Sequence, residues 1–182
     1  MAMDQTPDEP RDAPQPAGHA VIGRLGLGIA AAIVAADQAT KAVLRAHVAL
    51  HDDLVVIPGL LNLTHVRNTG AAFGLLNSVQ FPFKAQIIAV VATLALVGIA
   101  AYAARLAPGQ RLARVGLALI LGGAVGNLVD RVAVGYVLDF VDVYWGTVHF
   151  WAFNVADSAI TIGVGVMMFD MLGLGSHVPK TV

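Results

Sequence analysis

Four stretches of apolar residues, each close to the length of a membrane span, dominate the pattern of the chain. They cover roughly residues 22–44, 85–104, 112–130 and 152–172. A helix needs about 20 apolar residues to cross about 30 Å of hydrocarbon. The pattern therefore predicts four transmembrane helices, which would place both ends of the chain on the same side of the membrane.

The first apolar stretch has a second interpretation. Arg24 and the apolar run from Leu25 to Ala36 also fit a secretory signal peptide that is cleaved after export. The residues before Arg24 are acidic and rich in proline, which is a poor match to the basic start of such a peptide. We favour an uncleaved first span and keep cleavage as the alternative.

The two ends of the chain differ in composition from the apolar part. Residues 1–19 contain four of the eight prolines and four of the twelve acidic residues, with almost no large apolar side chain. Such a segment cannot bury enough surface to offset its ordering entropy. We therefore predict a disordered cytoplasmic tail over 1–19, one membrane domain over 20–175, and a C-terminal tail over 176–182.

Two connections between the spans have the two-residue alternation of strands. Leu61–Val66 and Val137–Tyr144 alternate polar and apolar side chains and are rich in valine and aromatic residues. The tract Tyr144–Phe153 contains both tryptophans, which favour the membrane–water boundary. The predicted fold class is an all-α membrane protein: a four-transmembrane-helix bundle with a small extracytoplasmic β-rich cap and an interfacial segment.

The distribution of basic residues predicts the orientation. The connection over 105–114 has three arginines and no acidic residue, whereas the connection over 131–151 has one arginine and two aspartates. Cytoplasmic loops carry the excess of basic residues. We therefore place the loop at Arg105 and both ends of the chain in the cytoplasm. The connection over 45–84 is less clear, because it mixes basic residues with Asp52 and Asp53.

Composition agrees with a membrane protein and excludes several classes of function. Of the 182 residues, 57% are hydrophobic and only 13% are charged, against about 25% in soluble domains. A net charge of -1 gives no basic surplus for nucleic acid. The absence of cysteine excludes disulfides, thiolate nucleophiles and zinc–thiolate sites. His47 and His51 are four residues apart, but we expect them at the surface, and we expect no metal site.

Polar residues gather where the predicted spans reach the outer side of the membrane. An ionisable group in hydrocarbon costs about 2.5–3.5 kcal/mol, so it is retained for a reason. The third span also contains Gly122–Gly126, whose small residues at a spacing of four favour close helix packing over a phosphate-binding loop. The polar residues at the outer ends of the spans are Asp37, Gln38, Lys41, Asn127, Asp130, Arg131, Asn154, Asp157 and Ser158.

Asp139 and Asp157 are candidates for a catalytic pair. Two carboxyl groups a few ångströms apart cannot both ionise easily, so they share a proton and can act together as acid and base in peptide hydrolysis. Spacing alone leaves two alternatives open. Asp139 could form a salt bridge with Arg131, or Asp37, Asp130 and Asp157 could line the ion path of a small transporter. A serine hydrolase is not favoured, because no Gly-x-Ser-x-Gly motif surrounds Ser158.

Five motifs in order along the chain give the sequence a family resemblance. It resembles the lipoprotein signal peptidases, or signal peptidase II, which are bacterial membrane aspartyl proteases, and the resemblance covers roughly residues 22–172. The motifs are Asp37-Gln-Ala-Thr-Lys41, Asn68-Thr-Gly-Ala-Ala-Phe73, Gly122-Gly-Ala-Val-Gly-Asn127 with Asp130-Arg131, Val137-Leu-Asp-Phe140, and Phe153-Asn-Val-Ala-Asp-Ser158.

The resemblance implies a function and a set of site residues. The catalytic pair corresponds to Asp139 and Asp157. The implied substrate is a prolipoprotein whose cysteine already bears a diacylglyceryl group, and cleavage occurs just before that cysteine. The implied protein has no cofactor or metal, contacts membrane lipid, and lies in the bacterial cytoplasmic membrane with its site on the extracytoplasmic side. We expect a monomer, because four spans that enclose one site give no reason to require a second copy. The supporting positions correspond to Asp37, Lys41, Asn68, Asn127, Asp130, Arg131 and Asn154.

Physical roles for some supporting residues can be proposed separately. Asn68 and Asn154 are amide donors to substrate carbonyls or to the developing oxyanion. Arg131 is a cation that orders neighbouring carboxylates, with Asp130 as its local partner.

Overall fold

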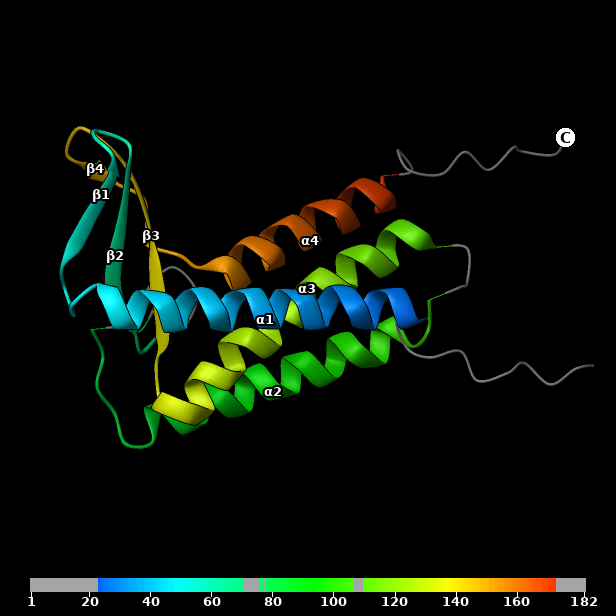
Figure 1. Ribbon diagram of the computed structural model, residues 1–182. Coiled ribbons are helices and arrows are strands. Elements are labelled where there is room, and N and C mark those ends of the chain that lie inside the picture. The colour runs from blue at the N-terminus through cyan, green and yellow to red at the C-terminus, as the bar shows by residue number, and fades with distance from the viewer. Residues whose placement is uncertain (1–22, 71–75, 77, 107–109, 173–182) are drawn as a thin grey trace, which may run out of the picture.

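The structure is a computed structural model that describes residues 23–70, 76, 78–106 and 110–172. Figure 1 shows the helices packed as a bundle, with a sheet at one end. We call this end of the bundle the sheet end. The helices of the described residues are α1 (Gly23–His47), α2 (Lys84–Ala103), α3 (Arg111–Val134) and α4 (Val155–Met171). The strands are β1 (Asp53–Ile57), β2 (Leu61–Asn68), β3 (Val137–Trp145) and β4 (Val148–His149).

All four predicted spans form helices. Within the described residues, α1, α2 and α3 are long and apolar enough to cross a membrane by length and composition. Helix α4 has 17 residues as described, so a fourth crossing stays a prediction. Helix α2 exposes apolar side chains such as Val90, Val91 and Leu94, as expected of a helix that faces lipid. The predicted tails over 1–19 and 176–182 lie outside the described residues.

Helix α3 lies at the centre of the bundle, and its glycines allow the neighbouring helices to approach closely. A Cβ added to Gly122 would lie 2.9 Å from the carbonyl oxygen of Ala30 in α1. A Cβ on Gly123 would overlap the carbonyl oxygen of Ala156 in α4. Small residues let helix backbones pack at short range in membranes. The packing role predicted for Gly122–Gly126 is therefore confirmed.

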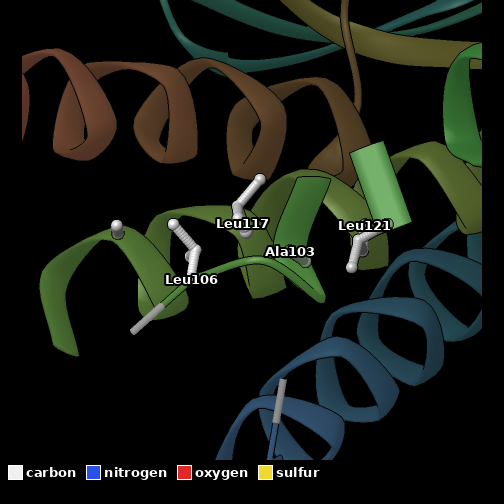
Figure 2. Packing of buried hydrophobic residues seen from close by; sticks show 5 residues of the cluster. Ala103, Leu106, Leu117 and Leu121 are labelled. Carbon is white, nitrogen blue, oxygen red and sulfur yellow. The ribbon is translucent and has the colours of Figure 1, made fainter. Parts of the chain in front are cut away.

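An apolar cluster holds α2 and α3 together towards the end of the bundle that lies away from the sheet. Leu117 and Leu121 of α3 are buried against Ala103 and Leu106 at the end of α2, and Ala113 completes the cluster. Figure 2 shows these side chains between the two helices. Dispersion contacts between closely packed side chains stabilise such a cluster.

The strands form one antiparallel sheet in the order β1-β2-β3-β4. The two strands predicted from alternation lie within β2 and β3, whereas β1 and β4 were not predicted. Leu44 and Val48 of α1 pack against Leu138 and Phe140 of β3, which fixes the sheet to the bundle. The all-α description is therefore incomplete, because strand β3 belongs to the same core as the helices.

The aromatic tract after β3 is exposed. Trp145 is 81% exposed and Trp151 is 63% exposed. Phe150 contacts Trp151 and Phe153 edge to face. Exposed tryptophans suit a membrane–water boundary, so the interfacial placement of this tract stays a prediction that the geometry allows.

Candidate functional site

The residues predicted to form the site come together at the sheet end of the bundle. Helices α1 and α3 both end there, and α4 begins there (Figure 1). The polar residues in the last turns of α1 and α3 thus meet the first turn of α4, and strands β2 and β3 cross beside them. The residues that this arrangement joins in one hydrogen-bond network are Asp37, Lys41, Asn68, Asn127, Asp130, Arg131, Asp139, Asn154 and Asp157.

Asn154 links the two candidate catalytic carboxyl groups. It is the N-cap of α4, and its Oδ1 accepts a hydrogen bond from the Asp157 backbone N at 2.9 Å. Its own backbone N donates to Asp157 Oδ2 at 3.2 Å, which completes a capping box. Its Nδ2 donates to Asp139 Oδ1 at 2.7 Å. One fully buried residue therefore contacts both carboxyl groups and holds them near each other.

Each remaining oxygen of the two carboxyl groups also accepts an amide hydrogen. Asn68 Nδ2 donates to Asp139 Oδ2 at 2.9 Å, and Asn127 Nδ2 donates to Asp157 Oδ1 at 2.7 Å. Burial raises the pKa of Asp139 to about 7, and the negative charge of Asp157 adds to this rise, against the opposing effect of the Asn68 and Asn154 hydrogen bonds. Asp139 can therefore hold a proton near neutral pH.

A buried ion cluster is connected to Asp157 through Asn127. Lys41 Nζ is 2.8 Å from Asp37 Oδ2 and 2.8 Å from Asp130 Oδ2, and these side chains are almost fully buried. Lys41 Nζ also donates to Asn127 Oδ1 at 3.1 Å. This contact fixes the amide of Asn127 with its Nδ2 towards Asp157. Asp37 and Lys41 are four residues apart on α1 and form an ion pair there, which orients a neighbour of the candidate pair.

Asp37 also connects α1 to the start of α4. Its Oδ1 accepts a hydrogen bond from the backbone N of Ala156 at 3.0 Å, one of the free N–H groups of the first helical turn. A Cβ on Gly126 of α3 would lie 2.8 Å from Asp37 Oδ2, so glycine leaves room for this carboxylate. Because α1 supplies Asp37 and Lys41, the site depends on the span that could also have been a cleaved signal peptide.

One predicted ion pair and one alternative that the spacing left open are not formed. Arg131 does not pair with Asp130: its Nη1 donates to the carbonyl of Asn127 at 3.2 Å and its Nη2 to the carbonyl of Gly70 at 3.1 Å. Asp130 instead pairs with Lys41 and with Arg45. Adjacent residues of a helix point in different directions, so Asp130 faces α1 while Arg131 faces the chain after β2. The alternative salt bridge of Arg131 with Asp139 is not formed either: Asp139 accepts amide hydrogens from Asn68 and Asn154, although its charge still acts on Arg131.

The two asparagines predicted as amide donors both contact one of the candidate catalytic carboxyl groups. The Nδ2 groups of Asn68 and Asn154 donate to Asp139 at 2.9 Å and 2.7 Å. Each asparagine is thus a fixed neighbour of this carboxyl group. Their donation to substrate carbonyls or to the developing oxyanion stays a prediction.

Some polar residues near the site were missed. Arg45 Nη2 contacts Asp130 Oδ1 at 2.9 Å, and its spacing of four after Lys41 could have revealed it. On the sheet, Asp142 pairs with His149 at 2.9 Å. Within the described ranges, no group of three or more histidine, aspartate or glutamate residues could hold a metal ion. His47 and His51 are exposed as predicted.

Comparisons with known proteins agree with one another. A sequence model of the family described as signal peptidase (SPase) II matches residues 29–173. The lipoprotein signal peptidase of Geobacter metallireducens is 47% identical over 136 residues, which cover 75% of this chain and 83% of that protein. The one from Symbiobacterium thermophilum is 42% identical over 148 residues, covering 81% and 94%.

The fold comparison finds membrane enzymes with a similar fold. A solved structure described as a bacterial membrane enzyme superposes with a TM-score of 0.74 at 31% identity, covering 87% of this chain and 93% of the other. A second structure with a similar description has a TM-score of 0.71 at 28% identity. The family match covers well over half of the chain. The chain therefore belongs to the signal peptidase II family, the lipoprotein signal peptidases.

Proposed function

We propose that this protein is an aspartic endopeptidase that removes the signal peptide from diacylglyceryl-modified prolipoproteins, cleaving just before the lipidated cysteine. Family membership makes the protein a membrane protease. The observation that supports the aspartic mechanism is the contact of Asn154 with both Asp139 and Asp157. Two partly buried carboxyl groups held by one residue can share a proton.

The proposed reaction uses that shared proton. The ionised carboxylate of the pair takes a proton from water, whose oxygen attacks the scissile carbonyl carbon. The protonated carboxyl group donates its hydrogen to the carbonyl oxygen, which forms a neutral tetrahedral intermediate. When the C–N bond breaks, the leaving amine takes the proton that came from water, and one hydroxyl proton of the intermediate returns to the other carboxylate, which leaves a carboxylic acid and restores the pair. The raised pKa of Asp139 supports a protonated partner near pH 7. Nothing in this sequence of steps requires a metal or an organic cofactor.

The residues around the pair are proposed to fix its geometry. Asn68 and Asn154 hold Asp139, while Asn127 holds Asp157. Lys41 orients Asn127 and is itself held by Asp37 and Asp130, and Arg131 ties the chain at Gly70 to α3. Preorganised groups of this kind lower a barrier because they do not have to reorganise during the reaction.

We propose that all four helices cross the bacterial cytoplasmic membrane and that the sheet end is extracytoplasmic. The basic residues Arg105, Arg111 and Arg114 lie at the opposite end of α2 and α3, and basic residues favour the cytoplasmic side. Both ends of the chain are then cytoplasmic. The signal helix of the substrate lies in the membrane beside a monomer of this protein, its acyl chains remain in lipid, and the scissile bond meets the pair where water enters.

The direct test uses two forms of one substrate. The purified enzyme is incubated in one reaction with a prolipoprotein that carries the diacylglyceryl group. In a second reaction it is incubated with the same prolipoprotein without that group. We expect a signal-peptide product from the modified form alone. Equal cleavage of both forms would contradict the proposed substrate, and cleavage of neither would contradict the function. The transporter alternative, which family membership does not favour, predicts ion flux in vesicles with no cleavage.

A further inference from the structure

Lys84, the first residue of α2, is a buried cation outside the set of site residues described above. It is 7% exposed. Burial of an ammonium group costs free energy unless the group is well solvated by the protein. Its place in the first turn of a helix is also unfavourable, because the helix dipole is positive there. Specific contacts must therefore offset both effects.

The contacts of Lys84 are with the connection between β2 and α2. Its Nζ donates to the backbone carbonyl of Leu76 at 2.5 Å, to that of Val79 at 2.9 Å and to Thr69 Oγ1 at 3.3 Å. An ammonium group has three hydrogens to donate. Leu76 and Phe83 have φ values of 66° and 59°, a left-handed conformation that is unfavourable for residues other than glycine. The ammonium thus holds carbonyls of a chain segment that includes strained residues.

The same connection begins at a residue that contacts the catalytic pair. Asn68 is the last residue of β2, and Thr69 follows it directly. The backbone N of Gly70 donates to Asn68 Oδ1 at 2.9 Å, which leaves Asn68 Nδ2 directed to Asp139. The carbonyl of Gly70 accepts from Arg131 at 3.1 Å. The position of Thr69 and Gly70 therefore determines how the amide of Asn68 meets Asp139.

We infer that Lys84 is a positioning residue that holds the chain at Thr69 and so keeps the amide of Asn68 on Asp139. This inference rests on the proposed function of the Asp139–Asp157 pair. Lys84 does not contact the reacting atoms; it acts through Asn68. A lysine suits this role because one point-like ammonium can bind a hydroxyl and two carbonyls that lie in different directions.

The inference has a consequence for proton affinity. The Asn68 hydrogen bond lowers the pKa of Asp139, so a displaced Asn68 amide raises that pKa further. The other ionisable groups that face Asp139 are Asp157 from α4, Lys41 from α1 and Arg131 from α3. The hydrogen bonds of Lys84 to Thr69, Leu76 and Val79 involve none of these three groups. A shift in the pKa of Asp139 that results from substitution of Lys84 should therefore disappear in a protein that also lacks the Asn68 side chain.

A double-mutant cycle tests this coupling. We expect Lys84→Met to lower kcat between about tenfold and 100-fold, the effect of a small displacement near reacting groups, with little change in KM. The apparent pKa in the pH profile of the rate should rise, as it should in Asn68→Ala. The double variant should be no worse than Asn68→Ala alone. Lys84→Arg should restore part of the rate, because it returns donors without the same geometry.

Controls separate positioning from charge and from folding. Arg67→Met removes an exposed cation next to Asn68 and should leave the pH profile unchanged. If Lys84→Met does not fold, Thr69→Val can be tested in its place. This variant removes one acceptor of the ammonium and should give a smaller shift of the pH profile in the same direction. Loss of thermal stability in Lys84→Met with an unchanged pH profile, or effects that multiply in the double variant, would overturn the inference.

The pKa of Asp139 can also be followed without substrate. The pH dependence of thermal stability, compared with that of Asp139→Asn, reports the same group. If the wild-type protein cleaves no prolipoprotein, the proposed function fails, but this measurement still shows whether Lys84→Met shifts the pKa of Asp139. An unshifted value would contradict the inference on its own.

Discussion

Both ends of the helix bundle contain buried side chains, but these side chains are polar at one end and apolar at the other. At the sheet end, Asp37, Lys41 and Asn154 are completely buried polar residues. At the other end, Leu117 and Ala103 are equally buried and apolar. Burial of polar groups stabilises a fold only when every group has a partner. The apolar end therefore holds the helices together, while the polar end fixes carboxyl groups at a cost in stability.

Helix α3 contributes to both ends, which makes the comparison testable within one element. Leu117 lies in its apolar part and Asn127 in its polar part, ten residues apart in the sequence. Substitutions at the polar end should change both stability and cleavage. Substitutions at the apolar end should change stability alone.

The largest loss of stability is expected at the ion cluster. Lys41→Met leaves the buried Asp37 and Asp130 without their shared cation, and breaking a buried pair costs about 3–5 kcal/mol. It also frees the amide of Asn127, so cleavage by the folded fraction should fall. Thermal unfolding in detergent and a cleavage assay measure the two effects. Wild-type stability in this variant would show that the cluster is not a buried network.

At the apolar end, Leu117→Ala should destabilise the protein by about 2–5 kcal/mol, the range for a leucine truncated in a packed core. The side chain is 2% exposed and contacts the end of α2. We expect kcat/KM of the folded protein to match the wild-type value at a temperature where both are folded. A selective fall in kcat would mean that the two ends are coupled.

The pH dependence of stability should distinguish the two ends as well. Asp139 has a pKa of about 7 in the folded protein against an ordinary value of 3.8. The folded state thus binds a proton that the unfolded state has released, so the stability from this group is present below pH 4 and is lost as pH rises to 7. The loss is up to about 4 kcal/mol, at about 1.4 kcal/mol per pH unit.

The matched variant for that experiment is Asp139→Asn, which removes the titrating group. Its stability should fall less between pH 4 and pH 8 than that of the wild type, and it should be the more stable protein at pH 8. Thermal melts across this range measure the difference. Parallel curves for the two proteins would contradict the raised pKa.

The smallest effect is expected at the edge of the ion cluster. Arg45 contacts Asp130, but its side chain is 31% exposed, and partly exposed pairs contribute about 0–1 kcal/mol. Arg45→Gln leaves Lys41 in place beside Asp130, so it is the control for Lys41→Met. A loss of stability as large as that of Lys41→Met would show that the number of cations beside Asp130, and not their burial, determines the stability of the cluster.

The sequence predicts the elements of this fold well where a periodic pattern exists. The four apolar stretches gave all four helices, and alternation gave β2 and β3. Strand β1 (Asp53–Ile57) was missed because all five residues are exposed, so no burial alternation marks it. Strand β4 has two residues, too few for any pattern.

The residues of the candidate site could be named from the sequence, but most of their contacts could not. Motifs named Asp139, Asp157 and the residues that the structure brings together around them, but the Asp130–Arg131 pair was inferred from adjacency, and adjacent helical residues face different neighbours. In the sequence, Lys84 is only one of the basic residues of the connection over 45–84. Its contacts with Leu76 and Val79 are to backbone carbonyls, which leave no mark in the sequence.

The most direct test of the proposed carboxyl pair is cleavage of a diacylglyceryl-modified prolipoprotein by Asp139→Asn and Asp157→Asn, with folding checked by thermal unfolding. The matched control is Asp142→Asn on the same strand, whose carboxylate pairs with His149. We predict folded proteins in all three cases, a fall in kcat of at least about 100-fold in the first two, and cleavage by the control. Near wild-type cleavage by either folded Asp139→Asn or Asp157→Asn would contradict the account.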